Sequence, residues 1–186
     1  GAERGYLISD RCFAGADVCA TSHTLSQGIR QSGTYDLILC GKQTTDGDTA
    51  QVGAETAEFL GIAHGANILE VLETGDTFVT VRMNLENKIQ TQKMELPCLL
   101  TVDKDVNTPR LPSYKRRIGM DPGCIKVMGL DDLEDRDPGH YGLKGSPTQV
   151  ERIFPPDKKT DKEIMEGTGR ELAQAMAAVL RKHKFI

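Results

Sequence analysis

The pattern of apolar and polar positions divides the start of the chain into alternating strands and helices. A short apolar run at residues 5–9 predicts a strand, and a helix capped by Asp17 is expected to reach about residue 31. Residues 36–41, DLILCG, form a continuous apolar run of the kind that is buried on both faces of a parallel sheet. A second helix is predicted over about 49–60. This order is typical of a doubly wound, mostly parallel α/β sheet.

The middle of the chain has a different pattern. Residues 67–83 read as two strands joined by a turn at Gly75, and residues 88–96 read as a third strand. Residues 97–103 are a further apolar strand. We therefore expect a small antiparallel meander attached to the α/β sheet.

The remainder is rich in proline, glycine and charge. Residues 107–124 predict an exposed basic loop, and one short strand is expected within 125–133. No periodicity follows over 134–159, which indicates an extended arm lying on a partner or on the rest of the chain. Thr160 and Glu163 form a capping-box pattern that predicts the start of a C-terminal helix.

That helix is expected to run to about His183, with an apolar face of Met165, Leu172, Met176, Val179 and Leu180. The pattern therefore divides the chain into an α/β domain over 1–133 and an arm and helix over 134–186.

Composition excludes several classes of protein. The chain has 186 residues, of which 38% are hydrophobic and 27% charged, and it contains no apolar run long enough to span a membrane. A net charge of −4 and the absence of tryptophan argue against a nucleic-acid partner. The five cysteines lack the spacing of zinc or redox motifs, and together with the absence of a secretory signal they indicate reduced thiols and a cytoplasmic location.

The candidate chemistry lies in DGDTAQVG, residues 46–53, between a predicted strand and a predicted helix. The first N–H groups of a helix have no internal partner, and the helix dipole favours an anion there. We expect these N–H groups to hold a phosphate, Asp48 to cap the helix, and Asp46 to bond a sugar hydroxyl or hold the loop. The competing interpretation is an ordinary helix cap with glycines in tight turns.

Other candidates come from the loop after the first strand and from isolated reactive side chains. In a parallel sheet that loop faces the same edge as residues 41–53, so Arg11 could meet an anion and Phe13 could stack on a ring; simple surface exposure is the alternative. Cys40 could touch a ligand or be a buried thiol. The four histidines are scattered without metal-ligand spacing, so no metal site is predicted.

The segment GKQTTDGDTAQVGAETAEFLGI resembles the beta subunit of an electron transfer flavoprotein. The segments SDRCFAGADVCATSHTLSQGI, LPCLLTVDKDVNTPRLPSYKRR and YGLKGSPTQVERIFPP extend the similarity to clostridial and electron-bifurcating members. This resemblance implies a Rossmann-like, adenine-nucleotide-binding fold that pairs with an alpha subunit. It also implies that the family's N-terminal portion is absent from this chain, which is expected to bind nucleotide poorly on its own.

The resemblance further implies a cofactor, which is FAD in bifurcating members and structural AMP in simple, non-redox scaffolds. The sequence DGDTAQVG favours FAD, which would take electrons from NADH or a dehydrogenase and pass them to the alpha-subunit FAD and to ferredoxin. The flavin supplies the chemistry, so no side chain is expected to be a catalyst. The candidate cofactor-binding residues are Cys40, Gly41, Asp46, Gly47, Asp48, Thr49, Ala50, Gln51, Val52, Gly53, Arg11 and Phe13.

The basic loop has an implied role as well. In the family, the corresponding loop docks an acyl-CoA or other dehydrogenase through an apolar anchor. Leu111 is the best match to that anchor, and the basic side chains of Lys115, Arg116 and Arg117 would meet an acidic partner or remain solvated.

Overall fold

The structure is a computed structural model that describes residues 2–155 and 164–186. It divides into two compact units, Gly1–Gln149 and Val150–Ile186, and each is considered by itself. The strands are β1 (Gly5–Ile8), β2 (Leu37–Gly41), β3 (Ala63–Thr74), β4 (Phe78–Leu85), β5 (Lys88–Glu95), β6 (Cys98–Val102) and β7 (Ile125–Met128). The helices are α1 (Val18–Ser32), α2 (Val52–Leu60), α3 (Tyr114–Ile118), α4 (Gly142–Gly145) and α5 (Gly169–Lys182), with 3₁₀ turns η1 (Arg11–Phe13), η2 (Pro122–Cys124), η3 (Leu130–Asp132) and η4 (Pro138–His140).

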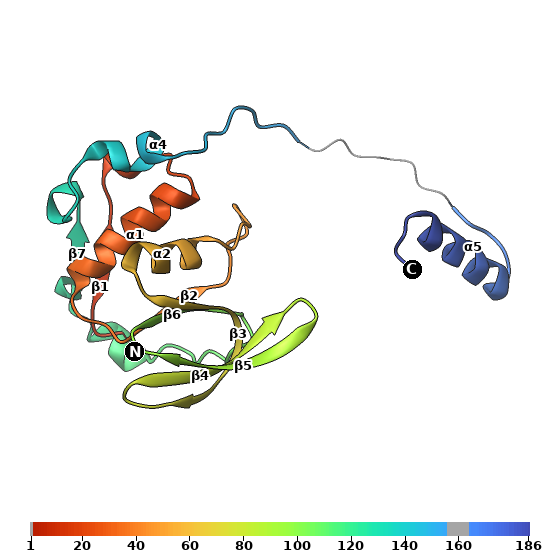
Figure 1. Ribbon diagram of the computed structural model, residues 1–186, viewed down its shortest axis with the longest axis horizontal. Helices are drawn as coiled ribbons and strands as arrows, with labels where there is room; N and C mark the ends of the chain where they lie inside the picture. The colour runs from red at the N-terminus through yellow and green to blue at the C-terminus, as the bar shows by residue number, and fades with distance from the viewer. Residues whose placement is uncertain (1, 156–163) are drawn as a thin grey trace. The chain divides into compact units, whose positions relative to one another are not determined.

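The first unit contains a five-stranded sheet with the order β2-β6-β3-β4-β5, which lies on one side of α1 and α2 (Figure 1). The strand β6 pairs in parallel with both β2 and β3, whereas β4 pairs antiparallel with β3 and β5. The predicted α/β sheet and its antiparallel meander are therefore confirmed.

Burial distinguishes the central strand from the edge strand. In β6, the four residues Cys98–Thr101 are all buried, as expected for a strand covered on both faces. In β2, Leu39 is 60% exposed, so the prediction that residues 36–41 are buried on both faces was wrong. The reason is position, since β2 pairs with β6 alone among the described residues and lies at the edge of the sheet.

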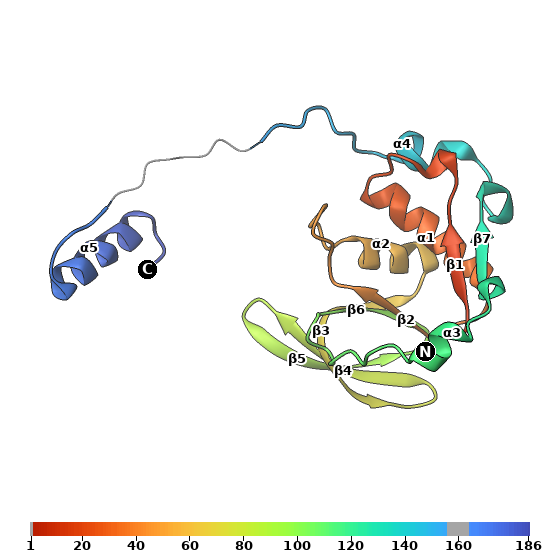
Figure 2. The same cartoon turned by 180° about the vertical axis from the view of Figure 1, so that it is seen from behind.

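The first strand does not join this sheet. Instead, β1 pairs in parallel with β7, from Gly5 opposite Ile125 to Ile8 opposite Met128, as a separate two-stranded sheet (Figure 2). The helix α1 contacts β1 and α2, while α2 packs on β3 and β6. The two helices thus connect the two sheets.

The core of the meander follows the period of a strand. Alternate residues of β4 are buried, which places Val79, Val81 and Met83 on one face. The buried cluster consists of Ile68, Val79, Val81, Met83, Met94, Cys98 and Leu100.

The predicted extended arm over 134–159 begins later than expected. Residues 134–149 belong to the first unit, where η4 and α4 fold against α1 and Tyr141 is fully buried. These turns are stabilised by local hydrogen bonds, such as that from the Gly139 N–H to Asp137 Oδ1 at 2.8 Å. Such turns do not require regularly spaced apolar residues, so the sequence shows no periodic pattern for them. The first compact unit extends to Gln149.

In the second unit, α5 begins later than the sequence predicted. Its cap is Thr168, whose N–H and Oγ1 both donate to Glu171 Oε2 at 2.8 Å. The predicted capping box at Thr160 and Glu163 lies outside the described residues. Met165 precedes the helix, and α5 contains no buried residue. None of the helices described here is long and apolar enough to cross a membrane.

Candidate functional site

The candidate site lies where β2 and β6 end side by side. Gly41 is opposite Val102 in the parallel register, and the Lys42 N–H donates to the Val102 carbonyl at 3.0 Å. The loop from residue 42 to residue 51 leaves this edge and leads into α2, and Figure 1 shows it projecting beside the helix. The carboxyl edge of a parallel sheet is the usual ligand position in this architecture.

Two residues of this loop hold an uncommon backbone conformation. Asp48 has a φ of 51° and Ala50 a φ of 56°, in the left-handed region that L-residues disfavour. Such conformations cluster at ligand sites. The loop is closed by Gln43 Nε2, which donates to Asp48 Oδ1 at 2.6 Å.

Asp46 holds the turn rather than facing a neighbouring element. Its Oδ1 accepts the Gly47 N–H at 2.8 Å. Hydrogen bonds from the Thr44 side chain and the Gly47 backbone hold the pKa of Asp46 below its usual value. This carboxylate therefore remains charged and exposed at neutral pH, consistent with the expectation that it holds the loop.

The start of α2 differs from the prediction. The helix begins at Val52, its cap residue is Gln51, and no side chain accepts a hydrogen bond there. The expectation that Asp48 caps the helix was wrong, because its left-handed backbone keeps it within the loop and its carboxylate bonds Gln43. The first amides of α2 thus have no side-chain cap, and the first bond that closes a helical turn runs from Glu55 N to Gln51 O at 3.0 Å.

Gly53 brings the start of α2 against the sheet. A Cβ at this position would lie 2.3 Å from Thr101 Cγ2 and 3.7 Å from Cys40 Cβ. Only glycine permits this approach, and it places the free amides of the helix beside the ends of β2 and β6. Burial raises the pKa of the Cys40 thiol, which is therefore neutral.

A groove of about 630 Å³ lies beside this loop and is the size of a typical small-molecule site. Two of its polar side chains form an ion pair, Lys42 Nζ to Asp103 Oδ2 at 3.5 Å. Of the candidate residues, Gly41 lines the groove. The candidates in 46–52 lie further along the same loop and are not part of the lining. The full lining is Gly41, Lys42, Gln43, Thr45, Val102, Asp103, Lys104, Val106 and Asn107.

Sequence reasoning missed the residues that follow β6. The run Asp103 to Asn107 comes directly after an apolar strand, which is the same signal that identified residues 41–53. Recognising that β6 is the neighbour of β2 would have added Lys104 and Asn107 to the candidate set.

Arg11 and Phe13 do not line the groove. The premise that the first strand shares the sheet edge of residues 41–53 was wrong, because β1 pairs with β7 in the other sheet. The Phe13 ring instead packs against Tyr141, with centroids 5.2 Å apart, and Arg11 is exposed.

The expected docking loop is exposed and partly helical. Leu111 is 93% exposed, and the three basic residues lie in α3, whose cap Ser113 Oγ accepts the Arg116 N–H at 3.4 Å. Leu111 and the three basic side chains of α3 are therefore all exposed to solvent.

The residues fit an adenine nucleotide. The uncapped start of α2 suits a phosphate or pyrophosphate, Lys104 adds a positive charge next to the Lys42–Asp103 ion pair, and the volume of the groove is large enough for a nucleoside. A parallel sheet with such a loop at its carboxyl edge defines an α/β protein of the class that binds ligands at this edge.

Comparison with known proteins identifies the family. The model described as "Electron transfer flavoprotein domain" matches residues 1–128, so the chain belongs to the electron transfer flavoprotein family. It is 37% identical over 186 residues to the electron transfer flavoprotein subunit beta of Clostridium acetobutylicum, covering 100% of this chain and 71% of that protein. It is also 37% identical over 187 residues to the caffeyl-CoA reductase-Etf complex subunit CarD of Acetobacterium woodii, again covering 100% and 71%. With protein FixA of Bradyrhizobium diazoefficiens the identity is 34% over 182 residues, covering 95% and 63%.

Proposed function

We propose that this chain acts as the beta subunit of an electron transfer flavoprotein and that the loop between β2 and α2 holds FAD. The observation that carries the proposal is the strained loop and uncapped helix start at the carboxyl edge of β2 and β6. The beta-subunit names of relatives that match over the whole of this chain support it.

In this proposal the backbone supplies the binding chemistry. The amides of Val52 and Gly53 donate to the pyrophosphate, Gly53 keeps them close to the sheet, and the groove beside Gly41 accommodates the sugar and base. When bound, FAD supplies the electron transfer itself, and this chain orients it and limits its contact with water. Electrons would come from NADH or a dehydrogenase and leave to the alpha-subunit FAD and to ferredoxin.

The second candidate function is a simple beta subunit that holds AMP as a structural element. The same amides and the same groove would serve a monophosphate equally well. The two functions differ in whether the nucleotide of this subunit is redox-active, and the loop sequence DGDTAQVG favours FAD through the resemblance stated above.

The partners follow from the same proposal. An alpha subunit would pair with this chain, and Leu111 with the basic helix α3 would contact an acyl-CoA or other dehydrogenase. A cytoplasmic location is part of the proposal, and it is supported by the five cysteines, all of which are free thiols.

The test is to identify the nucleotide that copurifies with the heterodimer of this chain and its alpha subunit. Heat-released nucleotide would be separated by liquid chromatography, in which FAD and AMP elute apart. A second FAD beside the flavin of the alpha subunit is expected. AMP in its place would select the second candidate function, and the absence of any nucleotide in this subunit would contradict both.

A further inference from the structure

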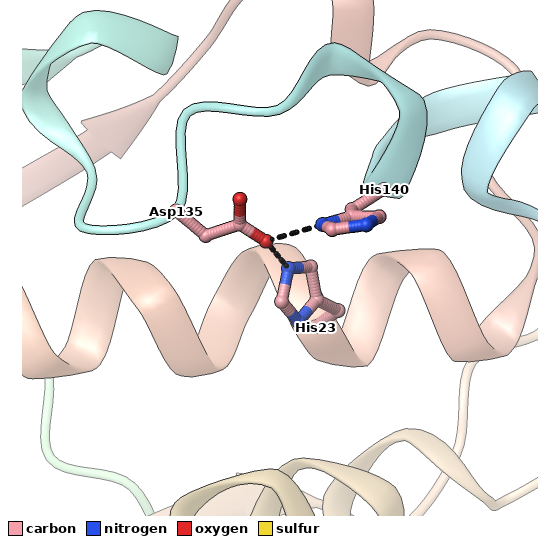
Figure 3. Close-up of side chains that lie close together, drawn as sticks. All are labelled: His23, Asp135 and His140. Atoms are coloured by element: carbon pink, nitrogen blue, oxygen red, sulfur yellow. Dashed lines mark hydrogen bonds and ion pairs between the residues drawn. The ribbon is translucent and has the colours of Figure 1, made fainter.

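Three side chains from separate segments meet on the outer side of α1. His23 lies on α1, Asp135 follows η3, and His140 ends η4, and Figure 3 shows both imidazole rings turned toward the same carboxylate. Asp135 Oδ2 lies 3.1 Å from His23 Nε2 and 2.7 Å from His140 Nδ1. One ligand atom from each residue lies within 4.8 Å of the other two.

The surroundings fix the carboxylate in place. The Asp135 N–H donates to Gln27 Oε1 at 3.2 Å, and its carbonyl accepts the Tyr141 hydroxyl at 2.6 Å. Its second carboxylate oxygen accepts the Asp137 N–H at 3.0 Å. Oδ2 is therefore the atom left to the two histidines.

The histidines are positioned as well. The His23 ring lies against Tyr141, at 5.0 Å between centroids, and against Phe59, at 5.3 Å. His140 has its second nitrogen, Nε2, 3.8 Å from Asp137 Oδ2. At this distance Asp137 makes no hydrogen bond to the ring and contributes only a negative charge near the non-ligating nitrogen.

A cavity of about 370 Å³ opens beside the cluster. It is lined by both histidines, by Cys19 one helical turn before His23, and by Lys144. A bound ion would therefore have room for a water or a small exogenous ligand in its coordination sphere.

We propose that His23 Nε2, Asp135 Oδ2 and His140 Nδ1 form a binding site for a divalent transition-metal ion of the zinc type. Two imidazoles and one carboxylate are a common ligand set for this class of ion. Ligand atoms around a tetrahedral zinc ion are separated by about 3.3 Å, so Oδ2 would move outward from its present 2.7 and 3.1 Å and both rings would turn from the oxygen toward the ion. The ion would join α1 to the segment of residues 135–140.

The alternative is a purely hydrogen-bonded cluster in which Asp135 bridges two histidines. The hydrogen bond and negative charge of Asp135 raise the pKa of His140, so a proton competes with the metal for this site. Binding is therefore measured at mildly alkaline pH, where the competition from a proton on His140 is weaker.

The test uses the full chain, stripped of metal with a chelator and titrated with Zn²⁺ by calorimetry. The variant His140→Gln removes one ligand from an exposed position, and His64→Gln, an exposed histidine on β3, is the matched control. We expect one equivalent of Zn²⁺ to bind the wild-type chain and the control equally. His140→Gln should lose about tenfold to 100-fold in affinity, since even partners outside the coordination sphere cost this much.

A second variant and a second readout keep the test decisive. Asp135→Asn should also lose affinity, and its circular dichroism spectrum without metal reports whether it folds. Co²⁺ can be bound in place of Zn²⁺, and its visible absorption spectrum depends on its ligands. The spectrum therefore distinguishes ligation by imidazole and carboxylate from ligation by the cysteine thiolates. Equal affinity in the wild type and His140→Gln, thiolate ligation, or no binding by the wild type would each overturn the proposal.

Discussion

Gly28 shows how a residue that weakens a sequence pattern can be required by packing. Glycine disfavours a helix, and in the sequence it only lowers the strength of the α1 pattern. In the structure, a Cβ at this position would lie 2.0 Å from Ile8 Cδ1, so glycine lets α1 lie against β1. The sequence predicted the helix correctly, but the close contact depends on a distant strand and leaves no local signal.

Gly53, at the candidate site, is also required by close packing, and this predicts the effect of a substitution. Gly53→Ala should lower the free energy of unfolding by about 1–3 kcal/mol, the usual effect of overpacking. Thr101 cannot turn away without loss, because its Oγ1 accepts the Asn67 N–H at 3.2 Å. Gly41→Ala, where a Cβ would meet nothing within 4 Å, is the control. Urea unfolding measures both, and equal midpoints would contradict this account.

Asp17 predicts a pH dependence. Its Oδ1 accepts the Ala20 N–H at 3.0 Å and its Oδ2 accepts the Thr148 hydroxyl at 2.7 Å. Burial raises the pKa of Asp17, but these hydrogen bonds outweigh it and the pKa lies below its ordinary value. Because the pKa of Asp17 is lower in the folded state than in the unfolded state, its charge stabilises the fold at any pH above the unfolded-state pKa of about 3.9. This stabilisation is lost as the pH falls through the folded-state pKa.

The variant Asp17→Ala should therefore lose about 0.5–2 kcal/mol at neutral pH, the usual effect of removing a helix cap. The difference from the wild type should shrink as the pH falls below about 4. Thermal unfolding across this pH range measures it, with the exposed Asp105→Ala as control. A difference that does not change with pH would show that the charge of Asp17 contributes nothing.

At the scale of elements, the sequence predicted β1 to β6 and α1 closely because each has a clear period or a continuous apolar run. It could not predict which strand is central, since DLILCG and PCLLTVD are equally apolar and only the pairing makes β6 central and β2 an edge. It also missed the folded turns of 134–149, because they are held by side-chain bonds to the backbone rather than by an apolar period.

The edge position of β2 predicts weak nucleotide binding by the 186-residue chain on its own. The loop after β2 supplies one wall of the groove, and no strand pairs with the outer edge of β2 within 2–155 and 164–186. FAD titrated against the chain and followed by flavin fluorescence should bind weakly or not at all. Tight, stoichiometric binding would contradict this expectation.

At the scale of the whole molecule, the candidate site and the proposed docking surface are distinct features of the first unit. The groove is formed by segments that follow β2 and β6, whereas Leu111 and α3 come later in the chain and lie outside its lining. Of the groove residues that follow β2, the sequence predicted Gly41, because it ends a strand and precedes a small-residue loop and a helix, but it did not predict Lys42, Gln43 or Thr45. The metal-ligand cluster was not predicted either, because His23, Asp135 and His140 are brought together only by the folding of 134–149.

Because Leu111 lies outside the groove, its substitution predicts an effect on electron transfer to the partner without an effect on folding. Leu111→Ala should leave the free energy of unfolding within about 0.5 kcal/mol of the wild type, because the side chain is exposed. It should lower the rate of electron transfer between the heterodimer and its dehydrogenase by roughly tenfold, the effect of losing an apolar anchor worth about 1.4 kcal/mol. Ile89→Ala, another exposed apolar residue, is the control. Equal rates for the two variants would remove Leu111 from the docking surface.

The most direct test of the central claim is the FAD affinity of the heterodimer carrying Gln51→Glu. This nearly isosteric change adds one negative charge at the cap of α2, where it leaves the helix stable but repels a phosphate. We predict a loss of roughly tenfold in affinity, with no loss for Gln31→Glu, which adds the same charge at an exposed position near the end of α1. Unchanged affinity in Gln51→Glu would show that the start of α2 does not hold the nucleotide.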